Sequence, residues 1–174
     1  MSEEIVNKVN QSALITLDLE QFFPKETIRI FDLKPLLFME LILKEKDFRT
    51  ALLTMDWSDY KQEIVGVYCS ADAVVPVWAY MLVTSYLQPY AKEVILGDEP
   101  AVLRQVITER IRAIDPEAYR DQRIVIKGCG NKPIGDFAYL EITKLLRPIA
   151  KSIMYGEPCS TVPVYKARGT APNP

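Results

Sequence analysis

The sequence predicts an α/β protein with a mostly parallel sheet of βαβ units, helices on both faces of that sheet, and an N-terminal β-hairpin/helical segment. Short apolar runs typical of strands alternate with longer segments typical of helices. The later strands recur about every 30 residues, which is the length of a βαβ unit. Ile124-Val125-Ile126 is uninterrupted by polar residues, as expected for a parallel strand covered on both faces.

The later part of the chain predicts four strands and three helices in alternation. We expect strands over 64–68, 93–96, 123–127 and 152–155, and helices over 73–87, 100–114 and 134–146. The helix over 73–87 is apolar almost all round, so it is expected to be the most buried.

The N-terminal part predicts two further strands and two helices. Residues 13–17 and 27–31 are expected to pair as a hairpin around a turn at Pro24-Lys25-Glu26. Asp32 is suited to cap a helix over 33–43, and Asp47 one over 48–55; this helix pair could form the face of a homodimer. A chain of 174 residues suits a single domain, with residues 1–12 and 167–174 expected to be flexible.

Composition excludes several classes of function. The net charge of −2 and the lack of a basic block speak against nucleic acid as a partner. No apolar stretch is long enough to span a membrane, and the N-terminus does not resemble a signal peptide, so we expect a cytoplasmic protein. The chain contains no histidine, which excludes histidine-based triads and histidine metal ligands.

All three cysteines follow predicted strands: Cys69, Cys129 and Cys159 each lie in a turn. The carboxyl ends of parallel strands meet at one edge of a sheet, where such folds bind ligands. If strand 64–68 lay between 93–96 and 123–127, with 152–155 beyond, the three thiols would be on adjacent strand ends. They could then bind zinc or an iron–sulfur cluster. The fourth ligand could be water, a partner's group, or the carboxylate of Asp72, Asp98 or Glu157.

Two other interpretations of the cysteines remain open. Cys129 precedes a predicted helix and lies near two lysines, which lower the pKa of a thiol; it could be the nucleophile of an enzyme, assisted by Asp72 or Asp98. Alternatively, the cysteines pack as small apolar residues in a scaffold or binding protein. The sequence does not decide whether the protein is an enzyme.

A glycine-rich turn overlaps the second cysteine. Gly128, Gly130, Asn131 and Lys132 lie between a predicted strand and helix, where backbone N–H groups can bind an anionic cofactor. The spacing matches neither dinucleotide-binding nor P-loop motifs. A tight turn that needs glycine for its backbone conformation is the alternative.

Six segments spread over nearly the whole chain resemble a bacterial family known only as domain of unknown function 2480. They are Ile15–Leu19, Leu43–Arg49, Cys69–Pro76, Tyr119–Arg123, Lys127–Gly130 and Ser152–Pro163. The resemblance implies no known activity or catalytic residue. It does imply an association with iron–sulfur assembly genes of the Suf type. Iron–sulfur assembly proteins as partners, and a metal- or cluster-handling accessory function, are what it leads us to expect.

Overall fold

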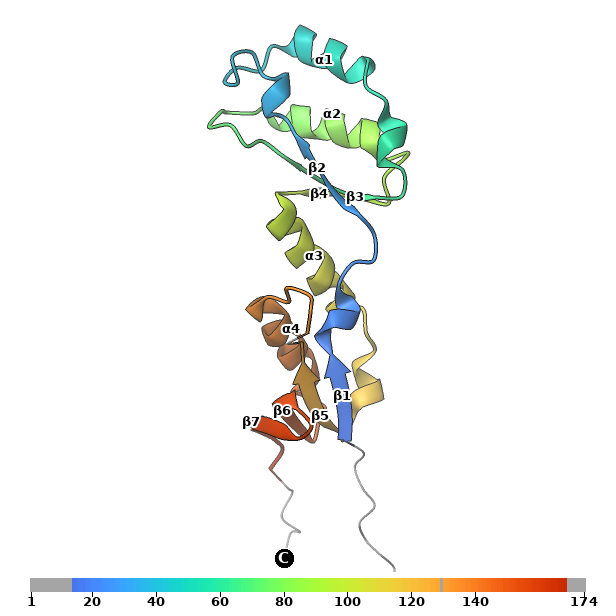
Figure 1. Ribbon diagram of the computed structural model, residues 1–174, viewed down its shortest axis with the longest axis vertical. Coiled ribbons are helices and arrows are strands. Elements are labelled where there is room, and N and C mark those ends of the chain that lie inside the picture. Colours follow the sequence, from blue (N-terminus) through green and yellow to red (C-terminus); the bar gives the residue numbers. More distant parts are fainter. Residues whose placement is uncertain (1–13, 129, 169–174) are drawn as a thin grey trace, which may run out of the picture. The chain divides into compact units, whose positions relative to one another are not determined.

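The computed structural model describes residues 14–128 and 130–168, which form two compact units. Unit 2 comprises Pro24–Val106, and unit 1 comprises the described residues before and after it. Each unit has its own sheet (Figure 1). The predicted α/β class with mostly parallel strands is confirmed, but the strands form two sheets instead of one.

Unit 2 has three layers. Its parallel strands are, in spatial order, β2 (Ile28–Asp32), β3 (Ile64–Tyr68) and β4 (Glu93–Leu96). Its helices are α1 (Glu45–Leu53), α2 (Val77–Leu87) and the first part of α3 (Glu99–Arg112), with the 3₁₀ turns η2 (Lys34–Leu36) and η3 (Trp57–Tyr60). Val65 packs with α1 and α2 on one face, whereas Ile64 packs with Val102 of α3 on the other (Figure 1). The expected helices on both faces are thus confirmed in this unit.

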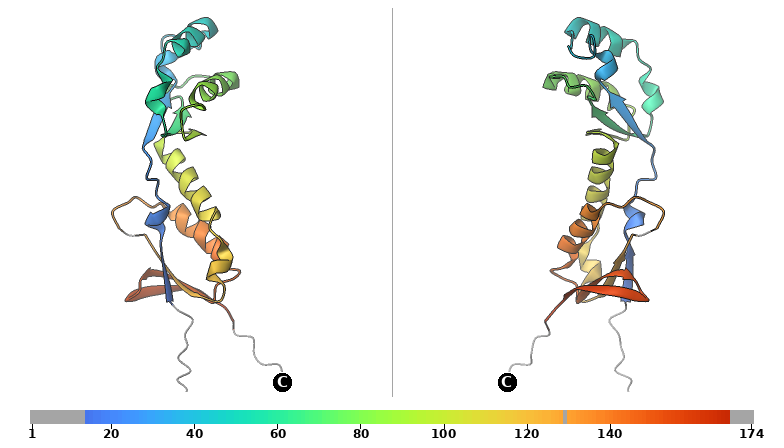
Figure 2. Two further views of the ribbon diagram at one scale, coloured as in Figure 1. Left: turned by 90° about the vertical axis from the view of Figure 1, so that its right-hand side faces the viewer. Right: turned by 60° about the vertical axis from the view of Figure 1, so that its left-hand side comes forward.

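Unit 1 contains a sheet of four strands. In spatial order these are β1 (Leu14–Asp18), β5 (Arg123–Lys127), β6 (Ser152–Glu157) and β7 (Ser160–Lys166). The first three are parallel, and β7 runs antiparallel along the outer edge of β6. Helix α4 (Asp136–Leu146) lies against one face of the sheet (Figure 2). The 3₁₀ turns of this unit are η1 (Leu19–Phe22) and η4 (Pro116–Tyr119).

The two units repeat the same succession of elements at a constant shift of 59 residues, as from position 64 to position 123. The shift relates β3 to β5, α2 to α4, η3 to η4, and the end of α1 to the end of α3. Gln62 and Asp121, both in the left-handed backbone conformation, recur at the same shift. Strands β1 and β2 complete the units, because β1 pairs in parallel with β5 and β2 pairs in parallel with β3.

The predicted N-terminal hairpin is wrong. β1 pairs with β5 and β2 with β3, so the two strands belong to different sheets. Between them Leu19 and Phe22 of η1 are buried, and the chain leaves unit 1 after Phe23 instead of turning back on itself. Each strand gains a long-range parallel neighbour in place of the local antiparallel one.

Two helix predictions also need correction. Residues 33–43 form only η2 and a tight reversal closed by a bridge between Phe38 and Ile42, because Met39 and Glu40 adopt left-handed conformations with φ of 52° and 59°. The expected dimer face on two helices over 33–55 therefore does not exist as predicted. Helix α2 is not buried all round either: Val77 and Met81 are 74% and 66% exposed.

Strand β7 was not predicted at all. Pro163 lies in its interior, and proline is found in strands mainly at sheet edges, where its missing N–H is not needed. Among residues 14–128 and 130–168, no helix is long and apolar enough to cross a membrane.

Candidate functional site

The strands that precede the three cysteines belong to two different sheets, and not to one sheet as predicted. Cys69 follows β3 in unit 2, is half-buried and packs against the core of that unit. Cys159 is exposed in the two-residue turn between β6 and β7 of unit 1. Cys129 lies outside the described residues. The strand order that would align their loops is wrong, because β5 pairs with β1 and β6, whereas β3 pairs with β2 and β4.

A metal site is likewise not visible in the part of the chain that the structure describes. No group of three or more histidine, cysteine, aspartate or glutamate side chains there could hold a metal ion. The carboxylate of Glu157 is instead 3.9 Å from the ammonium group of Lys127. The metal hypothesis loses its geometric argument, and since Cys129 is not described, it stays a prediction.

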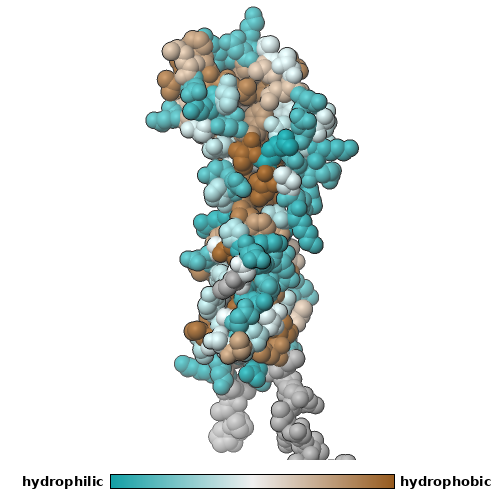
Figure 3. Space-filling model, in the orientation of Figure 1, coloured by the Kyte–Doolittle hydropathy of each residue, from teal (hydrophilic) through white to brown (hydrophobic). Residues whose placement is uncertain are grey.

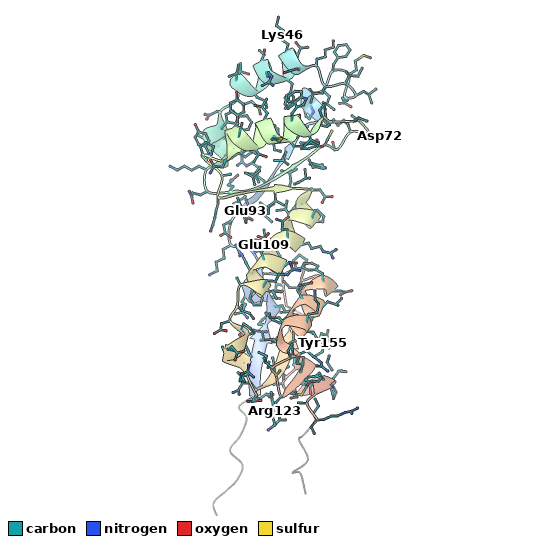
Figure 4. The ribbon with its side chains drawn as sticks, turned by 180° about the vertical axis from the view of Figure 1, so that it is seen from behind. Lys46, Asp72, Glu93, Glu109, Arg123 and Tyr155 are labelled. Atoms are coloured by element: carbon teal, nitrogen blue, oxygen red, sulfur yellow. The ribbon has the colours of Figure 1, made fainter. Side chains whose placement is uncertain are left out.

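The two predicted catalytic aspartates both belong to unit 2. Asp72 is exposed in the loop that follows β3 (Figure 4). It does not cap α2, because that helix begins at Val77 after Pro76. Asp98 precedes α3, and its carboxylate accepts a hydrogen bond of 3.0 Å from the N–H of Ala101. Asp98 therefore has the structural role of a helix cap.

Charged side chains do meet at the strand ends of unit 1. Lys127, at the end of β5, has its ammonium group 3.4 Å from the carboxylate of Asp18 at the end of β1. Glu157 at the end of β6 approaches the same lysine from the other neighbouring strand. These two ion pairs link the ends of β1, β5 and β6. All three side chains are partly exposed, so solvent weakens the attractions.

The glycine-rich turn approaches a carboxylate of the chain itself. The N–H of Lys132 donates a hydrogen bond of 3.4 Å to Glu20 of η1. A Cβ atom on Gly130 would come within 2.1 Å of that carboxylate, so a larger residue at this position would displace the flexible Glu20 side chain. Gly128 is buried beside Leu19, and Asn131 is exposed. Since Glu20 already accepts from this turn, an anionic cofactor would have to displace it.

One polar cluster escaped the sequence analysis. The carboxylate of Asp32, at the end of β2, accepts hydrogen bonds from the N–H of Lys34 at 3.0 Å and from the N–H and hydroxyl of Ser70 at 2.9 and 2.5 Å. Partial burial raises the pKa of Asp32, but these donors outweigh it, and the pKa lies below its usual value. Asp32 was expected only as a cap, since the sequence does not show that β2 and β3 are neighbours.

An apolar groove lies in unit 1 between α4 and the β6–β7 hairpin. It has a volume of about 730 Å³, within the range of ligand-binding pockets. Leu140 and Tyr139 of α4 form one wall, and Tyr155 of β6 and Val164 of β7 form the other. The rings of Tyr139 and Tyr155 meet edge to face, 5.6 Å apart, and Tyr155 is labelled beside α4 in Figure 4.

Unit 2 has a groove at the corresponding place, between α2 and β4. Its volume is about 580 Å³. Nine of its lining residues correspond, at the shift of 59 residues, to nine of the groove in unit 1: Val67, Val77, Tyr80, Met81, Thr84, Ser85, Val94, Ile95 and Leu96. The signal was present in the sequence, because Ala79-Tyr80 and Pro89-Tyr90-Ala91-Lys92 reappear as Ala138-Tyr139 and Pro148-Ile149-Ala150-Lys151.

The family profile described as "Protein of unknown function (DUF2480)" matches residues 3–167. The chain belongs to this family. The match covers nearly the whole chain and confirms the resemblance seen in the sequence. No curated protein and no solved structure matches the chain significantly. DUF2480 membership therefore names no reaction or ligand.

Proposed function

We propose that this DUF2480 protein is a binding protein, and that the groove of unit 1 holds a peptide segment of a partner protein. The observation that carries the proposal is the exposed apolar lining of the groove. Leu140, Tyr155 and Val164 are 63%, 42% and 54% exposed, although they lie next to one another around one depression. Gathered apolar side chains of this kind mark interaction sites, because covering them removes apolar surface from water.

Charged groups at the two ends of the groove suggest which peptide fits. Asp136 and Lys144 both line it and lie at opposite ends of α4. Eight helical residues span about 12 Å, which is the length of about four residues of extended chain. Lys144 also pairs with Glu141 at 2.9 Å. The groove thus suits a short apolar segment with a basic residue at one end and an acidic residue at the other.

The placement of the predicted catalytic groups favours binding over catalysis at this groove. Asp72 and Asp98 belong to unit 2 and do not line it. Asp98 is engaged by the N–H of Ala101. Cysteine chemistry at Cys129 stays a separate prediction.

A peptide-display library selected on the folded chain tests the proposal. We expect enrichment of segments with large apolar residues flanked by opposite charges. Leu140→Lys should weaken binding of the selected peptides by about tenfold or more, because it places a charge in the apolar wall. Met81→Lys changes the equivalent position of unit 2 and is the matched control. Peptides that bind the Leu140→Lys variant as well as the wild type would overturn the proposal.

A further inference from the structure

The two grooves differ in one element of structure. In unit 1, β7 pairs antiparallel with the outer edge of β6, and its Val164 completes the groove. In unit 2, β4 is the last strand of its sheet, and no described strand pairs with its outer edge. The N–H of Gly97 bonds to Val67 on the β3 side, so strand alternation directs the backbone groups of Val94 and Leu96 towards the open edge.

The surface beside this edge is strongly apolar. Leu96 of β4 is 71% exposed, and Val77 and Met81 of α2 are 74% and 66% exposed. All three line the same groove. At the position of Val77, unit 1 has the charged Asp136. Figure 3 shows apolar side chains at the surface of unit 2 in the region of its sheet. An open strand edge with apolar side chains along it is a template for pairing with another chain.

We propose that the outer edge of β4 pairs antiparallel with β4 of a second copy of this chain, so that the protein is a homodimer with a sheet continuous across both copies. The proposal stands independently of the peptide groove in unit 1. The corresponding edge in unit 1, that of β6, is covered by the antiparallel strand β7. We therefore expect an antiparallel strand to cover β4 as well. A strand that pairs antiparallel with its own copy forms a closed, two-fold interface and covers both open edges at once.

The sequence of β4 is complementary to itself in this arrangement. With Ile95 opposite its own copy at the two-fold axis, Val94 faces Leu96 of the partner subunit. Lys92, before the strand, then faces Asp98 of the partner subunit, after it. Opposite charges therefore meet at both ends of an apolar centre, whereas parallel pairing would bring like charges together. Lys92 also forms an ion pair with Glu26, and its side chain is 52% exposed.

Sedimentation equilibrium of the full chain over a range of concentrations tests the interface. The wild type should have twice the 19.8 kDa mass of one chain. Leu96→Lys should weaken dimerisation by about 100-fold or more, because both copies then carry a charge at the apolar centre. Tyr155→Lys, at the equivalent position of unit 1, where β7 already covers the edge, should leave the dimer intact. Since Leu96 is exposed, the variant should fold, which circular dichroism checks.

Hydrogen exchange gives a second, local readout. The amide of Val94 should exchange at least about tenfold faster in Leu96→Lys than in the wild-type dimer, with no change at β6. If Leu96→Lys failed to fold, Met81→Lys would replace it. A wild type that is monomeric throughout would overturn the proposal, as would a dimer that survives Leu96→Lys or dissociates with Tyr155→Lys. None of these results depends on whether a peptide binds the groove of unit 1.

Discussion

Asp32, at the end of β2, accepts three hydrogen bonds, two of which come from the loop after β3. Its partners are the N–H of Lys34 and the N–H and hydroxyl of Ser70. Such donors stabilise the ionised carboxylate, so the pKa of Asp32 in the folded chain is below its usual value of 3.8. A lowered folded-state pKa stabilises the fold at pH values above the unfolded pKa, and this stabilisation is lost as the pH falls through the folded pKa.

We therefore predict that Asp32→Asn lowers the free energy of unfolding by about 1 kcal/mol at neutral pH. The loss should shrink below pH 3.8, where the wild-type carboxyl also becomes protonated. Urea denaturation at a series of pH values measures it. Asp59→Asn, at an exposed aspartate of the same unit, is the control and should change stability by less than about 0.5 kcal/mol. A loss that grows on acidification would contradict the assignment.

At the scale of elements, α4 packs closely on the turn after β5. The phenolic oxygen of Tyr139 would be 2.7 Å from a Cβ atom on Gly128, and the Cβ of Leu19 would be 3.2 Å from it. Glycine therefore lets α4 and η1 approach the turn together, without any need for a special backbone conformation. The sequence suggested a glycine-rich turn for anion binding, but the structure gives Gly128 a packing role.

Gly128→Ala should lower the free energy of unfolding by about 1–3 kcal/mol through overpacking. The double variant Gly128→Ala/Tyr139→Phe should recover part of this loss, because it removes the nearest clashing atom. Thermal or urea unfolding of the single and double variants measures the coupling. Gly130→Ala should cost less, since its Cβ would meet only the end of the flexible Glu20 side chain. Equal losses in the single and double variants would refute the packing role.

The local sequence pattern predicted which segments are strands or helices much better than it predicted which strands are neighbours. Strands β3, β4, β5 and β6 were predicted within one or two residues, because buried parallel strands are short apolar runs bounded by turns. Strand β7 was missed, because it is half-exposed and contains Pro163. The false helix over 33–43 shows the converse: an apolar stretch without a clear helical period can form a turn.

At the scale of the whole molecule, the prediction that the three cysteines share a metal depends on Cys129, which lies outside the described residues. A triple variant of Cys69, Cys129 and Cys159, compared with wild type purified without oxygen, tests it by elemental analysis and visible absorption. If the three thiols bind metal, stoichiometric zinc, or iron with sulfide absorption, should be present in the wild type and lost in the variant. Metal-free, colourless wild-type protein would contradict the shared metal site and leave the nucleophile and packing interpretations of the cysteines.

The repeat of elements also belongs to this scale, and it relates the two proposals. Corresponding grooves in the two units are lined at nine equivalent positions, but only unit 1 has a strand along the outer edge. The two proposals assign a peptide partner to the groove of unit 1 and a second copy of the chain to the open edge of unit 2. The Leu140→Lys and Leu96→Lys variants separate these functions.

By itself, the sequence determined the α/β class, most strands and helices, and membership of the DUF2480 family, because these depend on local periodicity and on motifs along the chain. Only the tertiary structure decided which strands are neighbours. Ile15 pairs with Ile124 and Ile30 with Gly66, and nothing in the apolar pattern of β1 or β2 distinguishes these partners from each other. An apolar strand can pair in parallel with any other apolar strand, so the choice of neighbouring strands depends on the packing of the whole unit. That choice separates Cys69 from the sheet of β5 and β6, and leaves β4 with an open edge.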